Sequence, residues 1–367
     1  MRSTIVDALS SVDAGQWDRL ASGNLYQSHG WLTWLEPSTS ATARYVIVTG
    51  SDGELLAAAP YYVVERERNE FYRLDVLGLQ PDNGRVLMGA RNGYRNGVLA
   101  GDAESRRDAV RLVVDRVHEE AGGGGWWLYV TDDAVAELCE ILDRVPIFLE
   151  LEGRIPLPGN GWEDYLDSLP ASRRHAVRRE RRAFEKAGYA IGTARLDECW
   201  YEAGPLLANV QNRYGHGDSP DDARGYLASL GRAANPGAVT LCRRDDRLVG
   251  YCHYYDFGTT RWIRTFGLDY PALTGAFEYF ELAYYRQIAG AYAAGLRSVH
   301  CGIKSPQAKA VRGARLHPLW AVPVGEAAAS WPARRCRAHN RAALEATREM
   351  LGHACGAVDE TRWACYA

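Results

Sequence analysis

Lysine is almost missing from this sequence. Only three of its 43 basic residues are lysines (Lys186, Lys304 and Lys309), and the other forty are arginines. Such a bias is typical of a GC-rich coding sequence, so the arginine total alone says little about function. The 46 acidic residues bring the net charge to −3, which argues against a protein coated in positive charge but leaves room for a local basic groove.

Long apolar runs, an export signal and a cysteine framework are missing as well. No run approaches the roughly 20 residues of a membrane span, and the longest, 55–64, is interrupted by Pro60 and favours a strand. The first residues show no basic region followed by an apolar one, so we expect a cytoplasmic protein. The eight cysteines follow no regular spacing, which predicts free thiols and no metal site.

What is present is an ordinary globular composition, with 47% apolar and 11% aromatic residues in 367 positions. This length predicts about two domains, each with its own core. An internal similarity supports this division. Residues 46–64 (VIVTGSDGELLAAAPYYVV) align without gaps to 239–257 (VTLCRRDDRLVGYCHYYDF), and both read as strand, polar turn and strand.

The two halves also continue alike. In each, a third strand ends in an apolar-Gly-Leu sequence, at 77–79 and 266–268, and a helix follows, at 104–121 and 275–294. A short strand comes next, at 126–130 and 297–301. The second half adds a helix at 305–314 and a closing strand at 317–324, and helices at 162–187, 198–213 and 220–232 precede its hairpin. We expect two α/β lobes with mixed sheets, 1–152 and 153–325, and a helical tail, 326–367.

This order of elements resembles the GNAT acyltransferase fold, and its tandem occurrence resembles the Fem-like branch. Three stretches carry the resemblance: 26–36 (YQSHGWLTWLE), 165–189 (YLDSLPASRRHAVRRERRAFEKAGY) and 296–314 (LRSVHCGIKSPQAKAVRGA). The chain has no long coiled-coil arm, which separates it from members that build peptidoglycan. The resemblance implies acyl transfer in the second lobe, with the first lobe largely structural.

A dense basic segment lies within 173–182, where six arginines crowd ten residues. On a helix, Arg174, Arg178, Arg181 and Arg182 fall roughly on one side, and such a cluster suits the phosphates of an RNA or a nucleotide donor. The alternative is a solvated helix face, partly compensated by Glu180 and Glu185.

A second basic group follows the strand at 297–301. Lys304 precedes an expected helix start, and Lys309 and Arg312 lie about one turn apart on that helix. Amides at a helix start together with a lysine suit an anion, so we predict a donor-phosphate site here. The alternative is a surface that serves only solubility.

The candidate catalytic residues are His253, Tyr254 and Asp256 of the second hairpin, together with Glu278. Histidine, tyrosine or carboxylate side chains there would relay a proton from an attacking amine. The paired tyrosines recur in the first half at 61–62, so core packing is the alternative for them. The candidate substrate-binding residues are Tyr214, His216, Arg264 and Tyr279.

The segment before the helix at 275–294 reads DYPALTGA and lacks the Arg/Gln-x-x-Gly-x-Gly/Ala loop with which CoA-using GNAT enzymes hold a pyrophosphate. The leading hypothesis is therefore an N-acyltransferase that moves an aminoacyl group from aminoacyl-tRNA to an amine or hydroxylamine-type small molecule. It would have no bound cofactor, no membrane span and no DNA partner. An acyl-CoA or carrier-thioester donor, and a non-catalytic RNA- or protein-binding GNAT pair, are the alternatives.

Overall fold

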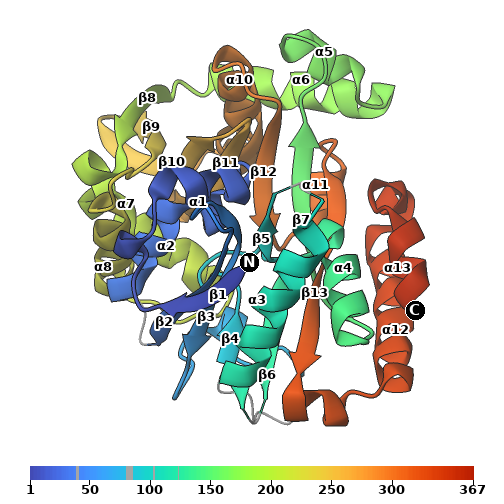
Figure 1. Ribbon diagram of the computed structural model, residues 1–367. Helices are drawn as coiled ribbons and strands as arrows, with labels where there is room; N and C mark the ends of the chain where they lie inside the picture. The colour runs from blue at the N-terminus through green and yellow to red at the C-terminus, as the bar shows by residue number, and fades with distance from the viewer. Residues whose placement is uncertain (39–40, 80–85, 102–103, 123) are drawn as a thin grey trace. The chain divides into compact units, whose positions relative to one another are not determined.

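A computed structural model of the chain describes residues 1–38, 41–79, 86–101, 104–122 and 124–367, and it divides into two compact units (Figure 1). Unit 1 comprises Met1–Glu152, Ile303–Gln307 and Leu316–Ala367. Unit 2 comprises Gly153–Gly302 and Ala308–Arg315. Both units combine helices with a mixed sheet, which confirms the predicted α/β class.

The strands of unit 1 are ordered β1-β2-β3-β4-β6-β13, and the short β5 pairs with β3. Neighbouring strands are antiparallel except β4 and β6, which are parallel. The division between the units falls inside β7. The strands are β1 (Arg2–Val6), β2 (Thr42–Thr49), β3 (Leu55–Val63), β4 (Val86–Met88), β5 (Leu99–Ala100), β6 (Gly125–Thr131), β7 (Ile147–Pro156) and β13 (Arg315–Val324).

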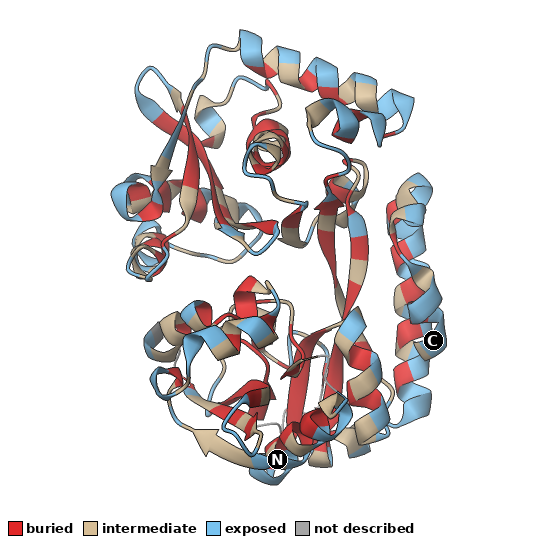
Figure 2. Cartoon of the chain, turned by 45° about the horizontal axis from the view of Figure 1, so that its top comes forward, coloured by how far each residue is buried: buried red, intermediate tan, exposed pale blue. Residues whose placement is uncertain are grey.

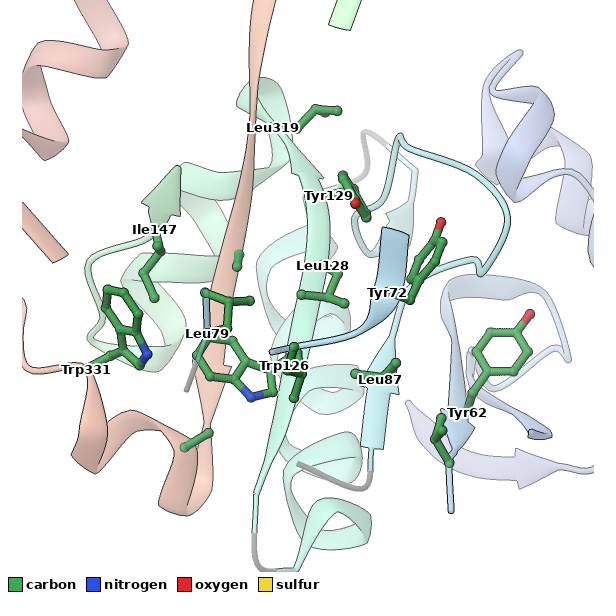
Figure 3. Close-up of a cluster of buried hydrophobic side chains, with 14 of the residues drawn as sticks. Tyr62, Tyr72, Leu79, Leu87, Trp126, Leu128, Tyr129, Ile147, Leu319 and Trp331 are labelled. Atoms are coloured by element: carbon green, nitrogen blue, oxygen red, sulfur yellow. The ribbon is translucent and has the colours of Figure 1, made fainter. Parts of the chain in front are cut away.

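Large aromatic side chains fill the core of unit 1. Trp126 and Leu128 are two positions apart on β6, so their side chains lie on the same side of the strand. They pack with Leu87 of β4 and Tyr62 of β3 in one buried cluster (Figure 3). Helix α3 packs on β2 and β3, and its last residue, Ala121, comes just before β6. The helices of this unit are α1 (Ala14–Ala21), α2 (His29–Ser38), α3 (Arg106–Ala121), α4 (Asp132–Leu142), α12 (Ala333–Leu351) and α13 (Glu360–Tyr366).

The strands of unit 2 are ordered β12-β11-β10-β9-β8. Only β11 and β12 are parallel, because a helical crossover joins them, whereas the other neighbours are antiparallel. The strands are β8 (Ala190–Arg195), β9 (Ala238–Arg244), β10 (Arg247–Phe257), β11 (Thr260–Leu268) and β12 (Ser298–Ile303).

Helices cover both faces of this second sheet. Leu206 of α7 approaches Gly267, while Leu282 of the crossover approaches Gly250. Gly267 pairs with Tyr251, the residue that follows Gly250 on β10. Because successive residues of a strand lie on opposite faces, the two leucines cover opposite faces of the sheet. The crossover is one helical run with a π-helical turn at Glu281–Tyr285. The helices are α5 (Trp162–Asp167), α6 (Ala171–Lys186), α7 (Leu196–Arg213), α8 (Pro220–Gly231), α9 (Glu278–Phe280) and α10 (Arg286–Ala293), and the short α11 (Pro306–Ala310) begins in unit 1 and ends in unit 2.

The expected hairpins occur as β2–β3 and β9–β10, but other expected elements differ. The third strand of the first half does not end at 77–79, which forms a turn with Gly78 at φ 72°; the strand that continues this sheet is β4. The expected helix 162–187 is split before Pro170, and the helix expected at 305–314 is the short α11. Pro170 stops the preceding helix because it restricts the residue before it.

The compact units do not contain the same residues as the expected lobes, although the first boundary lies between residues 152 and 153 in both cases. Strand β13 was expected to close the second lobe, yet Leu316–Val324 belongs to unit 1, where β13 pairs with β6 in antiparallel register. The expected tail, 326–367, packs in the same unit: Asn340 of α12 accepts from the amide of Phe148 at 2.9 Å and donates to the carbonyl of Pro146.

Candidate active site

Strands β11 and β12 of unit 2 diverge after a short paired stretch. Among the described residues, their parallel register covers three pairs, Thr260–Ser298, Arg261–Val299 and Trp262–His300. Residues 263–268 of β11 lie beyond this register, and we call this divergence of the two strands the opening. Backbone amides in such a position are donors for a carbonyl oxygen that gains negative charge.

A β-bulge in β11 shapes this opening. Tyr254 pairs with Ile263 and His253 with Thr265, so Arg264 is an extra residue on β11. As a result Ile263 and Phe266, three positions apart, pack against the same apolar cluster. Arg264 is directed to α8, where its guanidinium donates to the Tyr226 hydroxyl at 2.6 Å.

The walls of the opening are aromatic. Tyr279 and Phe280 are half-buried against the same cluster as Cys301 at the end of β12. The hydroxyls of Tyr279 and Tyr284 lie 3.2 Å apart. Burial raises the pKa of Tyr279, and it raises the pKa of the Cys301 thiol to about 12. Both groups are therefore protonated at neutral pH and are suited to donate hydrogen bonds, not to act as anionic nucleophiles.

A buried ion pair lies beside these aromatic residues. Arg312 is only 5% exposed, and its Nη2 lies 3.3 Å from Oε2 of Glu180 on α6. Its guanidinium carbon lies 3.4 Å from the centre of the Phe280 ring, and its Nε donates to the Tyr285 hydroxyl at 3.2 Å. Tyr285 in turn donates to Glu180. This network ties α6 to the crossover helix.

A second buried carboxylate makes a similar connection. Glu281 is 2% exposed, with Nε of Arg286 at 2.8 Å and Nε of Arg181 at 3.4 Å. Arg181 also stacks on the Trp162 ring, 4.4 Å from its centre. Desolvation raises the pKa of Glu281, while both arginines oppose that rise. Glu281 and Tyr285 both belong to the π-helical turn, a feature that occurs often at functional sites.

The four predicted catalytic residues do not converge on one point. Fully buried His253 lies on the α7 face of β10, and its Nε2 is 2.8 Å from the carbonyl oxygen of Pro236. Desolvation lowers the pKa of His253 to about 3, so the imidazole is neutral. Asp256 binds Arg261 through both oxygens at 2.8 Å, and the same guanidinium stacks on Tyr254 at 3.9 Å.

Glu278 occupies a structural position at the start of the crossover helix. Its Oε1 accepts from the Thr274 amide at 2.8 Å, from the Thr274 hydroxyl at 3.0 Å and from the Tyr189 hydroxyl at 2.7 Å. Burial opposes ionisation, but the bonds from Tyr189 and from the amides of Thr274, Ala276 and Glu278 itself leave the pKa of Glu278 lowered. The Glu278 carboxylate therefore supplies the negative charge to which the amide and hydroxyl of Thr274 are bound, and we call it an internal anion.

Of the four predicted substrate-binding residues, two lie close together. The hydroxyl of exposed Tyr214, on the loop after α7, is near enough to Tyr279 to affect its pKa. His216 follows on the same loop, whose conformation depends on positive φ at Gly215 and Gly217. Arg264, on the α8 side, is held by Tyr226 and does not join them.

The predicted donor-phosphate residues separate into exposed and buried sets. On α6, Arg174 pairs with Asp167 at 2.7 Å and Arg178 with Glu163 at 2.8 Å, while Arg182 bonds the carbonyl of Arg178. Arg181 is turned inward to Glu281.

Lys304 lies in unit 1, is 62% exposed at its side chain and contacts Glu150 at 2.5 Å. Lys309 and Arg312, in unit 2, are buried, and Lys309 donates to the carbonyl of Gly302. Lys304 and Ser305, just before α11, both have positive φ. In this conformation, the two buried cations are committed to protein partners.

Sequence reasoning overlooked the aromatic wall and the two buried carboxylate networks. The density of aromatic residues in GAFEYFELAYY (275–285) was a usable signal, since three of them line or adjoin the opening. The pairing of Glu180 with Arg312 had no signal, because 132 residues separate them. Within the described residues, no group of three or more His, Cys, Asp or Glu side chains is arranged to hold a metal ion.

Three solved structures share this fold at low sequence identity. FemX superposes with a TM-score of 0.60 and 13% identity, covering 87% of this chain and 96% of that one. The C-terminal domain of a putative lysylphosphatidylglycerol synthetase from Agrobacterium fabrum gives 0.55 and 10%, covering 86% and 92%. L-PGS from Bacillus licheniformis gives 0.50 and 11%, with the same coverage.

No protein-family model matches the sequence, and no curated protein sequence is significantly similar to it. None of the helices in the described ranges has the length and apolarity that a bilayer-spanning helix requires. The structural similarity, the order of the elements and the diverging strands agree with one another. The chain has the Fem-like GNAT fold that its sequence predicted.

Proposed function

We propose that this protein is an N-acyltransferase that transfers an aminoacyl group from aminoacyl-tRNA to an amine or hydroxylamine-type small molecule. The observation that carries the choice of donor is the position of Glu278. CoA-using GNAT enzymes bind a diphosphate at the start of the helix after the third strand of the hairpin sheet. Here the Glu278 carboxylate accepts from the amide of Thr274 and is only 3% exposed.

An internal carboxylate at this point disfavours a diphosphate for two reasons. It uses amide donors that a phosphate would need, and it places a negative charge where a second anion would have to bind. An aminoacyl-tRNA does not carry a diphosphate next to its ester. One structural neighbour is named as the C-terminal domain of a putative lysylphosphatidylglycerol synthetase, a name that is in keeping with transfer of an aminoacyl group.

The proposed reaction is a direct displacement. The acceptor nitrogen attacks the ester carbonyl carbon, a C–N bond forms, the C–O bond to the ribose breaks, and the ribose oxygen takes up the proton that the nitrogen loses. The β11 amides beyond the register that this strand shares with β12, together with the protonated Tyr279 hydroxyl, are the donors that we assign to the carbonyl oxygen. The protonated Cys301 thiol disfavours a covalent thioester intermediate.

Helix α6 supplies a surface for the RNA. Its outer side is exposed (Figure 2), and within the described part of the chain Arg173 and Arg179 have no carboxylate within ion-pair distance. The inner side of the same helix holds Glu180, bonded to Tyr285 of the crossover helix. Phosphate contacts on the outer side would thus be made by a helix anchored next to the aromatic opening.

The test is an assay of the purified protein with a pool of charged tRNAs and, separately, with acyl-CoA, over a panel of small amines and hydroxylamines. Mass spectrometry identifies the products. We expect aminoacylated products only from charged tRNA, with complete loss after RNase treatment. Turnover from acyl-CoA that survives RNase would refute the proposed donor. No turnover with either donor would favour a non-catalytic binding module.

A further inference from the structure

Helix α12 of unit 1 carries a row of arginines that the proposed reaction does not use. Its buried side, which includes Cys336, Asn340 and Leu344, packs within unit 1. At 100° per residue, Arg334, Arg337 and Arg341 lie within about 60° of one another on a flank beside that buried side, and all three are exposed. We call these three residues the α12 arginine row.

Within the described ranges this row forms no ion pair, although Glu345 lies one turn beyond Arg341 on the same side of the helix. Among the described residues, none of the three has a carboxylate within 4 Å; Arg337 donates to the backbone carbonyl of Cys365 at 3.1 Å. Arg348, one turn and more beyond the row, is paired with Glu360. Arg334 lies in the first turn of α12, which has no acidic residue, so its charge adds to the positive end of the helix dipole.

We propose that the α12 arginine row binds the phosphate backbone of the tRNA donor. The inference rests on the proposed function and extends it, because it places a tRNA contact in unit 1 in addition to α6 of unit 2. The row extends about 10 Å along the helix, long enough to meet several successive phosphates of one strand. Guanidinium groups suit this contact because they bind phosphate through two parallel hydrogen bonds.

An anionic membrane is the other polyanion that a basic helix can bind, and the surroundings of the row disfavour it. A helix that lies in a membrane interface needs large apolar side chains that enter the lipid. In the described ranges, the only exposed large apolar side chain on α12 is Met350, and it lies more than two turns from Arg341. Ala333, Ala338 and Ala342, which adjoin the row in the sequence, are too small to enter lipid.

The experiment compares three variants of the full-length chain in binding labelled tRNA by fluorescence anisotropy over a range of salt concentrations. The first is R334A/R337A/R341A. The second, R334K/R337K/R341K, keeps the charge. The third is a charge-matched control, R66A/R68A/R111A, which removes three exposed arginines from other parts of unit 1. Thermal unfolding verifies that each variant is folded.

We expect the alanine variant to bind tRNA about 10- to 100-fold more weakly near physiological salt. Its slope of log K against log salt should fall by about 2 to 3, since each lost phosphate contact removes about 0.7–0.9. The lysine variant and the control should stay within about threefold of the wild type. Transfer from charged tRNA by the alanine variant should show a raised KM and an almost unchanged kcat.

Equal affinity and slope for the alanine variant and the control would overturn the inference while leaving the proposed function intact, provided that the wild type transfers from charged tRNA. If the wild type neither binds tRNA nor uses it, both proposals fail together. The same variants are also tested for binding to phosphatidylglycerol vesicles. If the alanine variant lost binding to these vesicles but bound tRNA as the wild type does, the inference would be overturned in favour of a membrane surface.

Discussion

The Glu180–Arg312 pair makes a quantitative prediction about unit 2. The side chains of Glu180 and Arg312 are 10% and 7% exposed, so neither charge is well solvated. The substitution Glu180→Ala leaves the Arg312 guanidinium buried without a counter-charge and deprives the Tyr285 hydroxyl of its acceptor. Breaking a buried pair on one side costs about 3–5 kcal/mol.

For a domain of 150–250 residues, each kcal/mol shifts the Tm by about 2–4 °C, so the unfolding transition of unit 2 should shift down by about 6–20 °C. Calorimetry is the suitable assay, because two compact units can unfold in separate transitions. The matched control is Glu163→Ala, which removes the carboxylate of the exposed pair that Glu163 of α5 forms with Arg178 of α6. Exposed pairs contribute at most about 1 kcal/mol, so its Tm should change by less than about 4 °C.

The double substitution E180M/R312M separates the charge effect from packing. Because replacing both partners of a buried pair by apolar side chains is often neutral, the double variant should be more stable than E180A. Equal shifts in Tm for E180A and the Glu163 control would show that the Glu180–Arg312 pair contributes no more to stability than an exposed pair. A double variant as unstable as the sum of its single substitutions would refute the pairwise reasoning.

Three further predictions concern His253, Glu278 and Tyr279. The folded-state pKa of His253 is about 3, below the unfolded value of about 6.5. Its contribution to stability is therefore complete above pH 6.5 and decreases by about 1.4 kcal/mol for each pH unit as the pH falls from 6.5 towards 3. Urea unfolding over pH 4–8 should show this decrease in the free energy of unfolding of the wild type. In His253→Phe, the slope of that free energy against pH should be smaller by the contribution of one proton. Identical pH profiles would contradict the assigned pKa. Glu278→Ala should destabilise the chain by about 1–3 kcal/mol in the same urea assay, because it leaves the Thr274 amide without its acceptor; an unchanged midpoint would show that the carboxylate is not needed there. Tyr279→Phe should lower kcat for aminoacyl transfer about 10- to 100-fold with little change in Tm, whereas Tyr292→Phe, which loses only a bond to the carbonyl of Pro158, should keep its kcat. Equal kcat values for these two variants would exclude the Tyr279 hydroxyl from the reaction.

Sequence patterns predicted the parts of the fold that depend on neighbouring residues. The alternation along β9 and β10 and the apolar periodicity of α7 and of the crossover helix (278–293) are local, so the sequence predicts these elements within a few residues of their bounds. The turn at 77–79 was mistaken for a strand end because Leu77 and Leu79 are apolar; Leu79 is buried, but as part of a core contact made by a loop.

The site was harder to predict because its groups come from distant segments. The motif that suggested phosphate binding placed Lys304, Lys309 and Arg312 together, yet the structure gives them different partners in different units. Burial decides the state of His253 and Glu278, and burial depends on the packing of α7 and of the crossover helix. A basic residue in a sequence does not show whether its charge meets solvent or a carboxylate more than a hundred residues away.

The bulge at Arg264 has a consequence for how this chain can be compared with others. Because one extra residue sits in the middle of β11, the two halves of that strand alternate out of phase with each other. A gapless alignment of β11 with an unbulged strand would exchange inward and outward positions beyond this point. Deletion of residue 264 alone would remove the bulge and leave Ile263 and Phe266 two positions apart, so both would still face the cluster that they share. An alignment of β11 with an unbulged strand is therefore expected to need a one-residue gap at 264 and no other change of length.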